Sequence, residues 1–306
     1  MNEKARVAYV TLDVFTDRAF GGNPLAVVLD ARGLSDAEMQ AIAAEFHYSE
    51  TTFLLPAEDA RHTARVRIFT PVGELPFAGH PNVGTAFVVA NLGTLFGKPI
   101  GDSLLFEEGA GLVPIALIRE DGIVVGARLT APRPLALGPE VTPGIVAESV
   151  GLDVAEIVAK PYPPVIASVG LPFLFASLAS CAALARCRPA AQAFARHFPI
   201  ADARAIHLSV RDGANVRARV FVDHGMIIED PATGSANVAF AALTAARLPE
   251  PEGVIALDIV QGVEMGRPSR LAAQAIKRGG KVNTAEIGGR CVAVMEGRLS
   301  FTRGAA

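Results

Sequence analysis

Most of the chain consists of short apolar runs separated by turns, a pattern typical of strands rather than helices. Residues 64–71 show it clearly, because charged and apolar side chains alternate from Arg65 to Phe69. No regular alternation of strands with helices is visible, which argues against a doubly wound parallel sheet. The strands that we expect are residues 7–15, 25–29, 50–56, 64–71, 112–119, 122–129, 216–222, 254–260 and 291–301.

Residues 36–46 are an exception, because their apolar side chains recur at helical spacing. Ser35 precedes the segment as a candidate N-cap, and Glu38 follows three residues later, which completes a capping box. We therefore expect an amphipathic helix here. Its buried face would consist of Met39, Ile42, Ala43 and Phe46.

A long stretch without charge, residues 161–185, has the length of a membrane-spanning helix. Four prolines and a glycine interrupt it, however, and a helix tolerates such breakers poorly. The pieces between them, residues 165–170 and 173–178, have the size and composition of buried strands. We expect two strands of a core and no membrane span.

Two segments of the chain resemble one another, GHPNVGTA at residues 79–86 and EDPATGSA at 229–236. Each precedes a run that is apolar on nearly every side, and the second copy lies 150 residues after the first. A helix of that kind must be enclosed all round, here by strands. The pattern predicts an α+β protein of two duplicated, pseudo-symmetric halves, each with a sheet around a central helix. The proline-rich residues 129–143 are the expected linker.

The two repeated turns are also candidate binding elements. The start of a helix offers unpaired N–H groups and a partial positive charge, so it binds carboxylates well. Gly84 and Gly234 would let a ligand approach these groups, and Thr85 and Ser235 would add hydroxyls. The alternative is that the turns are ordinary caps, with Asp230 as an N-cap. That alternative does not explain His80, since histidine is a poor N-cap.

Two carboxylates compete as acid/base candidates. Glu50 stands between an amphipathic helix and an apolar strand, where desolvation would favour its protonated form. It could equally be a solvated residue at a strand start. Glu74, next to Gly73, is the second candidate, and it could also be an exposed turn residue. Local sequence does not separate the two.

Composition restricts the function class further. Hydrophobic residues make up 51% of the 306 and charged residues 19%, which excludes intrinsic disorder. The net charge is −3 with no basic cluster, so neither nucleic acid nor an anionic membrane is an expected partner. Walker A, GxGxxG, HExxH and GxSxG motifs are absent, and the histidines lack metal-ligand spacing. We expect no metal and no nucleotide cofactor.

The three cysteines form no CxxC pair, and their odd number disfavours a disulfide framework. Cys181 and Cys187 lie in or beside an alanine-rich stretch, so we expect both to be buried structural residues. The first residues include Glu3 and lack the apolar run of a signal peptide. These features together predict a cytoplasmic protein.

Five strings together resemble the phenazine-biosynthesis isomerase family, the PhzF-like proteins, which share the diaminopimelate epimerase fold. The similarity runs in order along nearly the whole chain, and the combination is far more specific than any single string. The strings are DVFTDRAFGGNPLAVV (13–28), HYSETTFLL (47–55), FTPVGELPFAGHPNVGTA (69–86), EDPATGSAN (229–237) and QGVEMGRPSRL (261–271).

The resemblance implies two barrel-like, mostly antiparallel domains with the active site between them, no cofactor or metal, and a homodimer. The expected domains are residues 1–128 with about 293–306, and residues 129–292. The expected activity is an isomerase that moves a proton within a small unsaturated cyclic carboxylate similar to trans-2,3-dihydro-3-hydroxyanthranilate.

The resemblance also assigns site residues. Glu50 matches the family's general acid/base, with His80 and Asp230 as further catalytic residues. Thiol-using relatives on this fold carry cysteines at the helix-start turns, where this chain has Gly79 and Asp230. Two alternatives remain, a non-catalytic carboxylate-binding protein and a thiol-independent epimerase or racemase. The expected substrate-binding residues are Gly79, Gly84, Thr85, Gly234 and Ser235.

Overall fold

The computed structural model describes residues 4–223 and 226–302. The chain forms two compact units, Met1–Leu129 with Gly289–Ala306, and Thr130–Gly288. One long strand, β20 (Lys281–Thr302), belongs to both units.

The first unit is a closed ring of strands around one helix. Following the hydrogen-bonded pairs, its order is β1-β2-β3-β4-β8-β9-β10-β20, and β20 pairs with β1 again. The elements are β1 (Lys4–Val14), β2 (Asn23–Val28), α1 (Asp36–Phe46), β3 (Glu50–Leu55), β4 (Ala64–Thr70), β5 (Gly73–Leu75), α2 (Gly79–Leu92), β6 (Thr94–Leu95), β7 (Lys98–Pro99), β8 (Ser103–Glu108), β9 (Gly111–Glu120) and β10 (Ile123–Thr130).

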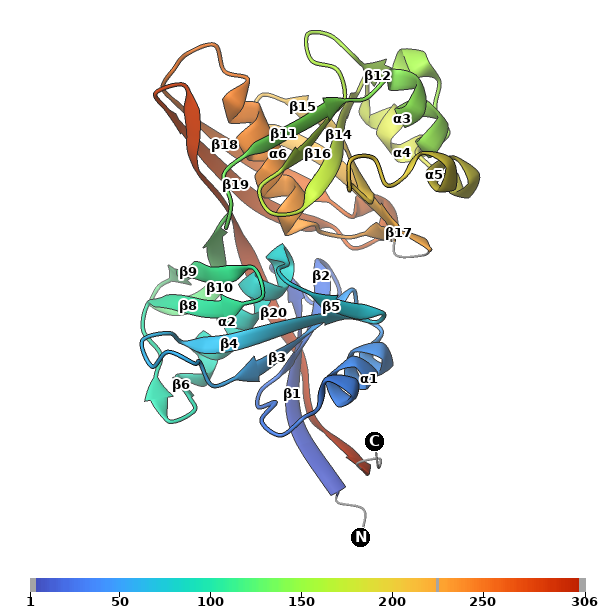
Figure 1. The fold of residues 1–306 in the computed structure, drawn as a ribbon. Coiled ribbons are helices and arrows are strands. Elements are labelled where there is room, and N and C mark those ends of the chain that lie inside the picture. Colours follow the sequence, from blue (N-terminus) through green and yellow to red (C-terminus); the bar gives the residue numbers. More distant parts are fainter. Residues whose placement is uncertain (1–3, 224–225, 303–306) are drawn as a thin grey trace. The chain divides into compact units, whose positions relative to one another are not determined.

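Helix α2 occupies the interior of this ring, as the expected all-round apolar pattern requires (Figure 1). Almost all of its residues from Gly79 to Val89 are buried. Gly84 lies against the sheet, since a Cβ there would stand 2.6 Å from Leu25 and 2.7 Å from Val14. The helix therefore packs closely because one of its inward positions has no side chain.

The second unit repeats this plan around α6. Its strands pair in the order β11-β13-β14-β15-β16-β18-β19-β20. The elements are β11 (Ala136–Glu140), α3 (Pro143–Val150), the 3₁₀ turn η1 (Val154–Glu156), β12 (Ile157–Val158), β13 (Val165–Ser168), β14 (Pro172–Leu178), α4 (Cys181–Arg186), α5 (Ala191–His197), β15 (Ala205–Asp212), β16 (Asn215–Asp223), β17 (Ile227–Asp230), α6 (Gly234–Ala246), β18 (Gly253–Gln261), η2 (Val263–Met265) and β19 (Ser269–Arg278).

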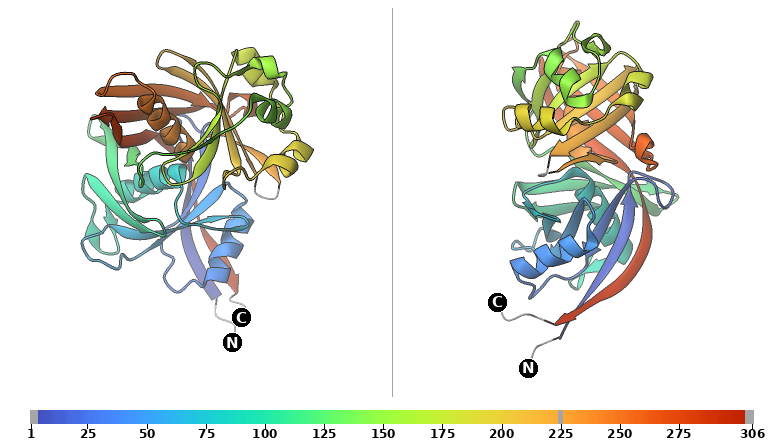
Figure 2. Two further views of the ribbon diagram at one scale, coloured as in Figure 1. Left: turned by 45° about the horizontal axis from the view of Figure 1, so that its top comes forward. Right: turned by 90° about the vertical axis from the view of Figure 1, so that its right-hand side faces the viewer.

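The two units share one pairing scheme. From β1 to β10 the pairs run antiparallel, parallel, antiparallel, parallel, antiparallel, antiparallel. From β13 to β20 they follow the same sequence. In each unit a short strand comes before the central helix, β5 in the first unit and β17 in the second. This short strand pairs with the fourth strand of the scheme, which is β4 or β16. The predicted fold class, two pseudo-symmetric α+β domains with a curved sheet around a central helix, is confirmed (Figure 2).

Several predicted elements are confirmed. The backbone N–H of Ser35 donates to Glu38 Oε2 over 2.8 Å, and the N–H of Glu38 donates to Ser35 Oγ over 3.2 Å. This is the capping box of α1. All nine predicted strands are present, and the charge-free segment 161–185 contains β13 and β14. In the described part of the chain, no helix is both long and apolar enough to cross a bilayer.

Two expectations and one alternative were wrong. Residues 136–140 of the supposed linker form strand β11, which pairs with β13. Cys181 is exposed at the start of α4, whereas Cys187 and Cys291 are buried. Helix α6 begins at Gly234 after the N-cap Thr233, so Asp230 is the last residue of β17 and does not cap the helix.

Candidate functional site

In the first unit the structure brings Glu50 and His80 together. Glu50 begins β3, and His80 is the second residue of α2. Glu50 Oε2 lies 3.5 Å from His80 Nδ1. The Glu50 side chain is 15% exposed and that of His80 only 4%, so Glu50 is the more accessible residue of the pair. This is the geometry of a base with a fixed hydrogen-bonding neighbour.

Asn23 sets the orientation of the imidazole. Its side-chain nitrogen lies 3.3 Å from His80 Nδ1, and its oxygen accepts a hydrogen bond from Ser49 Oγ over 3.4 Å. Ser49 and Asn23 together therefore hold the imidazole in place beside Glu50.

The glycine before Asn23 makes this arrangement possible. Gly22 has a φ of +61°, and a Cβ there would lie 2.2 Å from the carbonyl oxygen of Val14. Only glycine fits such a position without displacing the backbone. The GGNP string therefore has a structural cause, since it places the Asn23 amide against His80.

Burial keeps His80 neutral. Desolvation lowers its pKa from 6.5 to about 3, and a backbone hydrogen bond with Pro24 acts in the opposite direction. The contact with Glu50 is therefore a contact between a carboxyl group and a neutral ring rather than an ion pair. His80 can serve as a hydrogen-bonding group but not as a cation near neutral pH.

Two residues assigned to substrate binding lie elsewhere on α2. Gly84 and Thr85 are buried in the second turn of the helix, away from its first N–H groups. Thr85 Oγ1 lies 2.8 Å from Thr52 Oγ1 on β3. The expectation that these residues lie at the helix start was wrong, because α2 begins at Gly79. Both residues pack the helix against the sheet.

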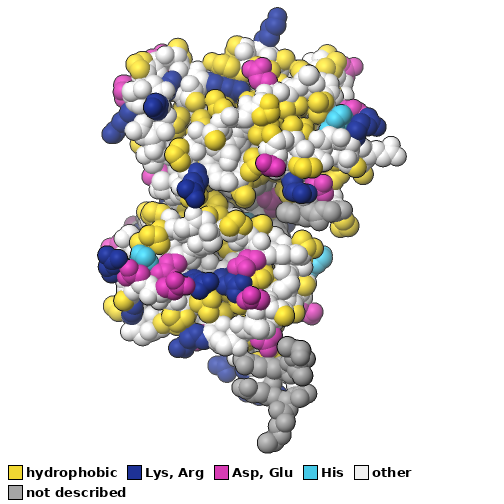
Figure 3. Space-filling view, viewed as in Figure 1, with side chains coloured by type: hydrophobic (Ala, Val, Ile, Leu, Met, Phe, Trp, Pro, Cys, Tyr) yellow, Lys and Arg dark blue, Asp and Glu magenta, His cyan; other side chains and the backbone are white. Residues whose placement is uncertain are grey.

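The competing carboxylate, Glu74, forms an ion pair on the surface. Its two oxygens accept from the Arg67 guanidinium over 2.7 and 2.6 Å, and Arg67 also pairs with Asp36. The Glu74 side chain is 42% exposed. Figure 3 shows basic and acidic side chains next to one another on this face of the first unit. A carboxylate held in this way is a poor base, so Glu50 is the better candidate.

In the second unit, a hydrogen-bonded cluster surrounds Asp230. The Thr233 hydroxyl donates to Asp230 Oδ2 over 2.6 Å. Gln261, the last residue of β18, donates through Nε2 to the Asp230 carbonyl over 2.8 Å and to Thr233 Oγ1 over 3.1 Å. Gln261 Oε1 accepts from the backbone N–H of Thr233 over 3.2 Å. Gln261 thus holds the backbone of Asp230 and the start of α6, and Thr233 holds the carboxylate.

The cluster extends into the core through Asn237. Its amide nitrogen donates to Gln261 Oε1 over 2.7 Å and to the Thr233 carbonyl over 3.0 Å. Its oxygen lies 3.0 Å from His207 Nε2. Desolvation lowers the pKa of the fully buried His207 to about 4, so the ring is neutral and donates through Nε2. Neither Gln261 nor His207 was predicted from the sequence, although Gln261 opens one of the matched strings.

The helix starts reveal which residues correspond in the two units. The first five residues of the two helices align as GHPNV from Gly79 and GSANV from Gly234. The glycine, asparagine and valine are the same in both. His80 therefore corresponds to Ser235, at an offset of 155 residues, and not to Asp230 at an offset of 150. Ser235 is 9% exposed in the first turn of α6.

The cysteines do not lie at either helix start. Cys187 follows α4, and desolvation raises its pKa to about 11. Cys291 lies within β20, and burial raises its pKa further still. Among the residues that the structure describes, no group of three or more His, Cys, Asp or Glu could hold a metal ion.

A sequence profile described as "Phenazine biosynthesis-like protein" matches residues 12–297. An uncharacterized isomerase of Mesorhizobium japonicum is 39% identical over 298 residues, covering 95% of this chain and 98% of that protein. The trans-2,3-dihydro-3-hydroxyanthranilate isomerase of Pseudomonas aeruginosa is 38% identical over 291 residues, with the same coverage. A PhzF-family protein of Bacillus anthracis has a similar crystal structure, with a TM-score of 0.82, 26% identity and coverage of 96% and 99%.

Proposed function

The chain belongs to the phenazine biosynthesis-like family and is an isomerase, and from this premise we propose that it moves a proton within a small unsaturated cyclic carboxylate. The observation that carries the proposal is the pair of Glu50 Oε2 and His80 Nδ1 at 3.5 Å, with His80 neutral. Glu74 is held in an ion pair with Arg67, whereas Glu50 lies beside the neutral imidazole of His80, which favours Glu50 as the base.

The proposed reaction has two proton transfers. Glu50 takes a proton from a substrate carbon, and the electron pair of the broken C–H bond delocalises over the conjugated system. The proton on the Glu50 carboxyl group exchanges with solvent, and Glu50 then delivers a proton to another carbon of that system. Nothing is oxidised or reduced, and the reaction gains and loses no atoms. A positioned base contributes about 10²–10⁴-fold to such a step.

The remaining site residues would stabilise charge that develops on the substrate. Asp230 and Ser235, together with His80, would hydrogen-bond its polar groups, and the N–H groups that begin α2 and α6 would bind its carboxylate. Gly79 and Gly234 are the first residues of those helices and leave their N–H groups unobstructed. We propose all six as site residues: Gly79, Glu50 and His80 in the first unit, and Asp230, Gly234 and Ser235 in the second.

We propose further that the enzyme needs no metal or organic cofactor, acts in the cytoplasm and functions as a homodimer. The first point has a chemical reason, because transfer of a proton between two carbons requires an acid/base group but no electron carrier. Dimerisation follows the family resemblance, and the location follows the cysteine usage.

The substrate proposal is tested with trans-2,3-dihydro-3-hydroxyanthranilate, the compound in the name of the Pseudomonas aeruginosa relative. Purified protein treated with a chelator is incubated with this acid, and the product is followed by NMR. We expect a regioisomer in which one hydrogen has moved. A product that differs from the substrate only in handedness would replace the isomerase proposal with an epimerase, and binding without turnover would indicate a carboxylate-binding protein.

A further inference from the structure

A second buried carboxyl group lies in the first unit, outside the proposed acid/base pair. Glu108 is the last residue of β8, and both of its carboxyl oxygens are buried. Neither oxygen has a hydrogen-bond partner of good geometry among the residues that the structure describes. Burial of a carboxyl group in this way is costly unless the group is neutral or has a specific role.

The shared pairing scheme gives Glu108 a counterpart in the second unit. Strands β8 and β18 hold the same place, each parallel to the strand on one side and antiparallel to the strand on the other. Glu108 ends β8, and Gln261 ends β18. The residue that corresponds to Glu108 is therefore the glutamine that holds the start of α6.

The helices that face these two residues correspond as well. Asn82 and Asn237 each lie four residues after the N-cap, and each amide nitrogen donates back to the N-cap carbonyl, over 2.9 and 3.0 Å. In the second unit Asn237 also donates to Gln261. In the first unit the Asn82 side chain interacts with the Glu108 carboxyl group.

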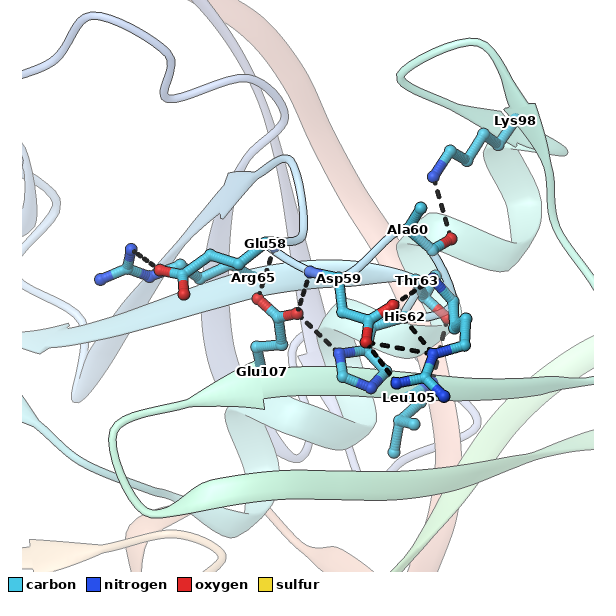
Figure 4. A network of polar contacts seen from close by, with 10 residues as sticks. Glu58, Asp59, Ala60, His62, Thr63, Arg65, Lys98, Leu105 and Glu107 are labelled. Carbon is cyan, nitrogen blue, oxygen red and sulfur yellow. Dashed lines mark hydrogen bonds and ion pairs between the residues drawn. The ribbon is translucent and has the colours of Figure 1, made fainter.

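The neighbouring residue fixes the direction of Glu108. Glu107 accepts hydrogen bonds from the backbone N–H groups of Glu58 and Asp59, over 2.8 and 2.9 Å, and its Oε1 lies 2.6 Å from His62 Nδ1 (Figure 4). Successive side chains of a strand point to opposite faces. Since Glu107 points to this outer network, Glu108 points to the inner face, where α2 lies.

The chemistry of a neutral carboxyl group completes the correspondence. Desolvation raises the pKa of Glu108 to about 8, and Asn82 acts in the opposite direction. A protonated carboxyl group has one carbonyl acceptor and one O–H donor, so it resembles a glutamine amide in shape and in hydrogen bonding. At neutral pH, Glu108 can therefore do for α2 what Gln261 does for α6.

We propose that Glu108 is a positioning residue of the active site, which in its neutral acid form orients Asn82 and so holds the first turn of α2 with His80. The chain of contacts runs from Glu108 to Asn82, from Asn82 to the carbonyl of Ala78, and along the turn that carries His80. This inference rests on the proposed function only in naming His80 as a site residue.

The proposal is tested with Glu108→Gln and Glu108→Ala, compared with wild type. Glutamine keeps the acceptor and a donor, so we expect turnover of trans-2,3-dihydro-3-hydroxyanthranilate within about threefold of wild type. Alanine should lower kcat by about tenfold, the effect of one lost hydrogen bond, with a smaller change in KM. Loss of activity in both variants to the same degree would overturn the proposal, because the ionisable proton itself would then be required.

A spectroscopic measurement is independent of turnover. At pH 7, the infrared spectrum of the wild type should contain the carbonyl band of a buried protonated carboxylic acid, and Glu108→Gln should lack it. The absence of such a band in wild type would overturn the proposal even if the substrate guess fails. If Glu108→Ala does not fold, Asn82→Ala takes its place, since it breaks the same chain of contacts and should cause the same loss.

Discussion

The Thr233 hydroxyl donates a hydrogen bond of 2.6 Å to Oδ2 of Asp230, and Thr233 is also the N-cap residue of α6. One oxygen of the carboxylate is therefore fixed to the start of the helix. Gln261 reinforces this arrangement because it binds both residues. Gly262 permits the close approach, since it has a φ of +75° and a Cβ there would lie 2.6 Å from the carbonyl oxygen of Pro231.

Replacing Thr233 by valine should lower kcat/KM without unfolding the protein. Valine keeps the shape of threonine but removes the donor to Asp230. A hydrogen bond to a charged group contributes about 1.5–3 kcal/mol, so we expect a loss of roughly ten- to hundredfold. Steady-state kinetics measure the effect.

The matched control is Thr244→Val in the same helix. The Thr244 hydroxyl donates to the carbonyl of Phe240 over 2.7 Å and lies far along α6 from Asp230. This variant should keep its activity, and Thr233→Ser should recover most of it. Equal losses in both valine variants would mean that the Thr233 contact is structural only.

The two buried imidazoles should make the protein less stable as the pH falls. Their pKa is about 3 for His80 and about 4 for His207 in the folded state, against 6.5 in an unfolded chain. Below pH 6.5 the unfolded chain takes up a proton that the folded chain does not, so acid favours unfolding. Each group should lower the free energy of unfolding by about 1.4 kcal/mol per pH unit, down to its folded pKa.

Urea unfolding between pH 8 and pH 4.5 tests this dependence. In His207→Gln an amide replaces the ring, so the pH slope below 6.5 should decrease by about 1.4 kcal/mol per unit relative to wild type. The substitution also lowers the stability at pH 8. The comparison therefore uses the change in the free energy of unfolding per pH unit and not its absolute value. An unchanged slope would show that His207 is not held neutral.

Gly84→Ala should destabilise the protein although alanine favours helices. The new Cβ would approach Leu25 and Val14 within 2.6 and 2.7 Å, and overpacking of a core costs about 1–3 kcal/mol. Helix propensity returns only about 1 kcal/mol. Gly144→Ala in α3 is the control, because a Cβ there meets nothing within 4 Å, and it should not destabilise. Thermal unfolding measures the midpoint of each variant. Equal midpoints for Gly84→Ala and Gly144→Ala would contradict the packing argument.

The sequence predicts the local features of the fold well. The capping box of Ser35 and Glu38 and the strands around Arg65 depend on neighbouring residues, and the structure contains both. The all-round apolar runs after residues 86 and 236 correctly indicate two enclosed helices. The site residues Glu50 and His80 were found through matched strings, since nothing local separates Glu50 from Glu74.

The features that the sequence does not predict depend on long-range pairing. Glu108 and Gln261 acquire their roles because strand pairing brings them to helices 26 and 24 residues away along the chain, at Asn82 and Asn237. The sequence comparison also aligned the two helix starts wrongly, because it paired His80 with Asp230. A proline is tolerated in the first turn of a helix or before it, and Pro81 lies within α2 whereas Pro231 precedes α6.

The most direct test of the proposed mechanism is proton exchange catalysed by Glu50. Wild type, Glu50→Gln and the matched control Glu74→Gln are incubated with trans-2,3-dihydro-3-hydroxyanthranilate in D₂O, and deuterium uptake is followed by NMR. We expect wild type and Glu74→Gln to incorporate deuterium at similar rates. Glu50→Gln should be slower by about 10²–10⁴-fold, the contribution of a positioned base. Exchange by Glu50→Gln at the wild-type rate would contradict the assignment of Glu50 as the base.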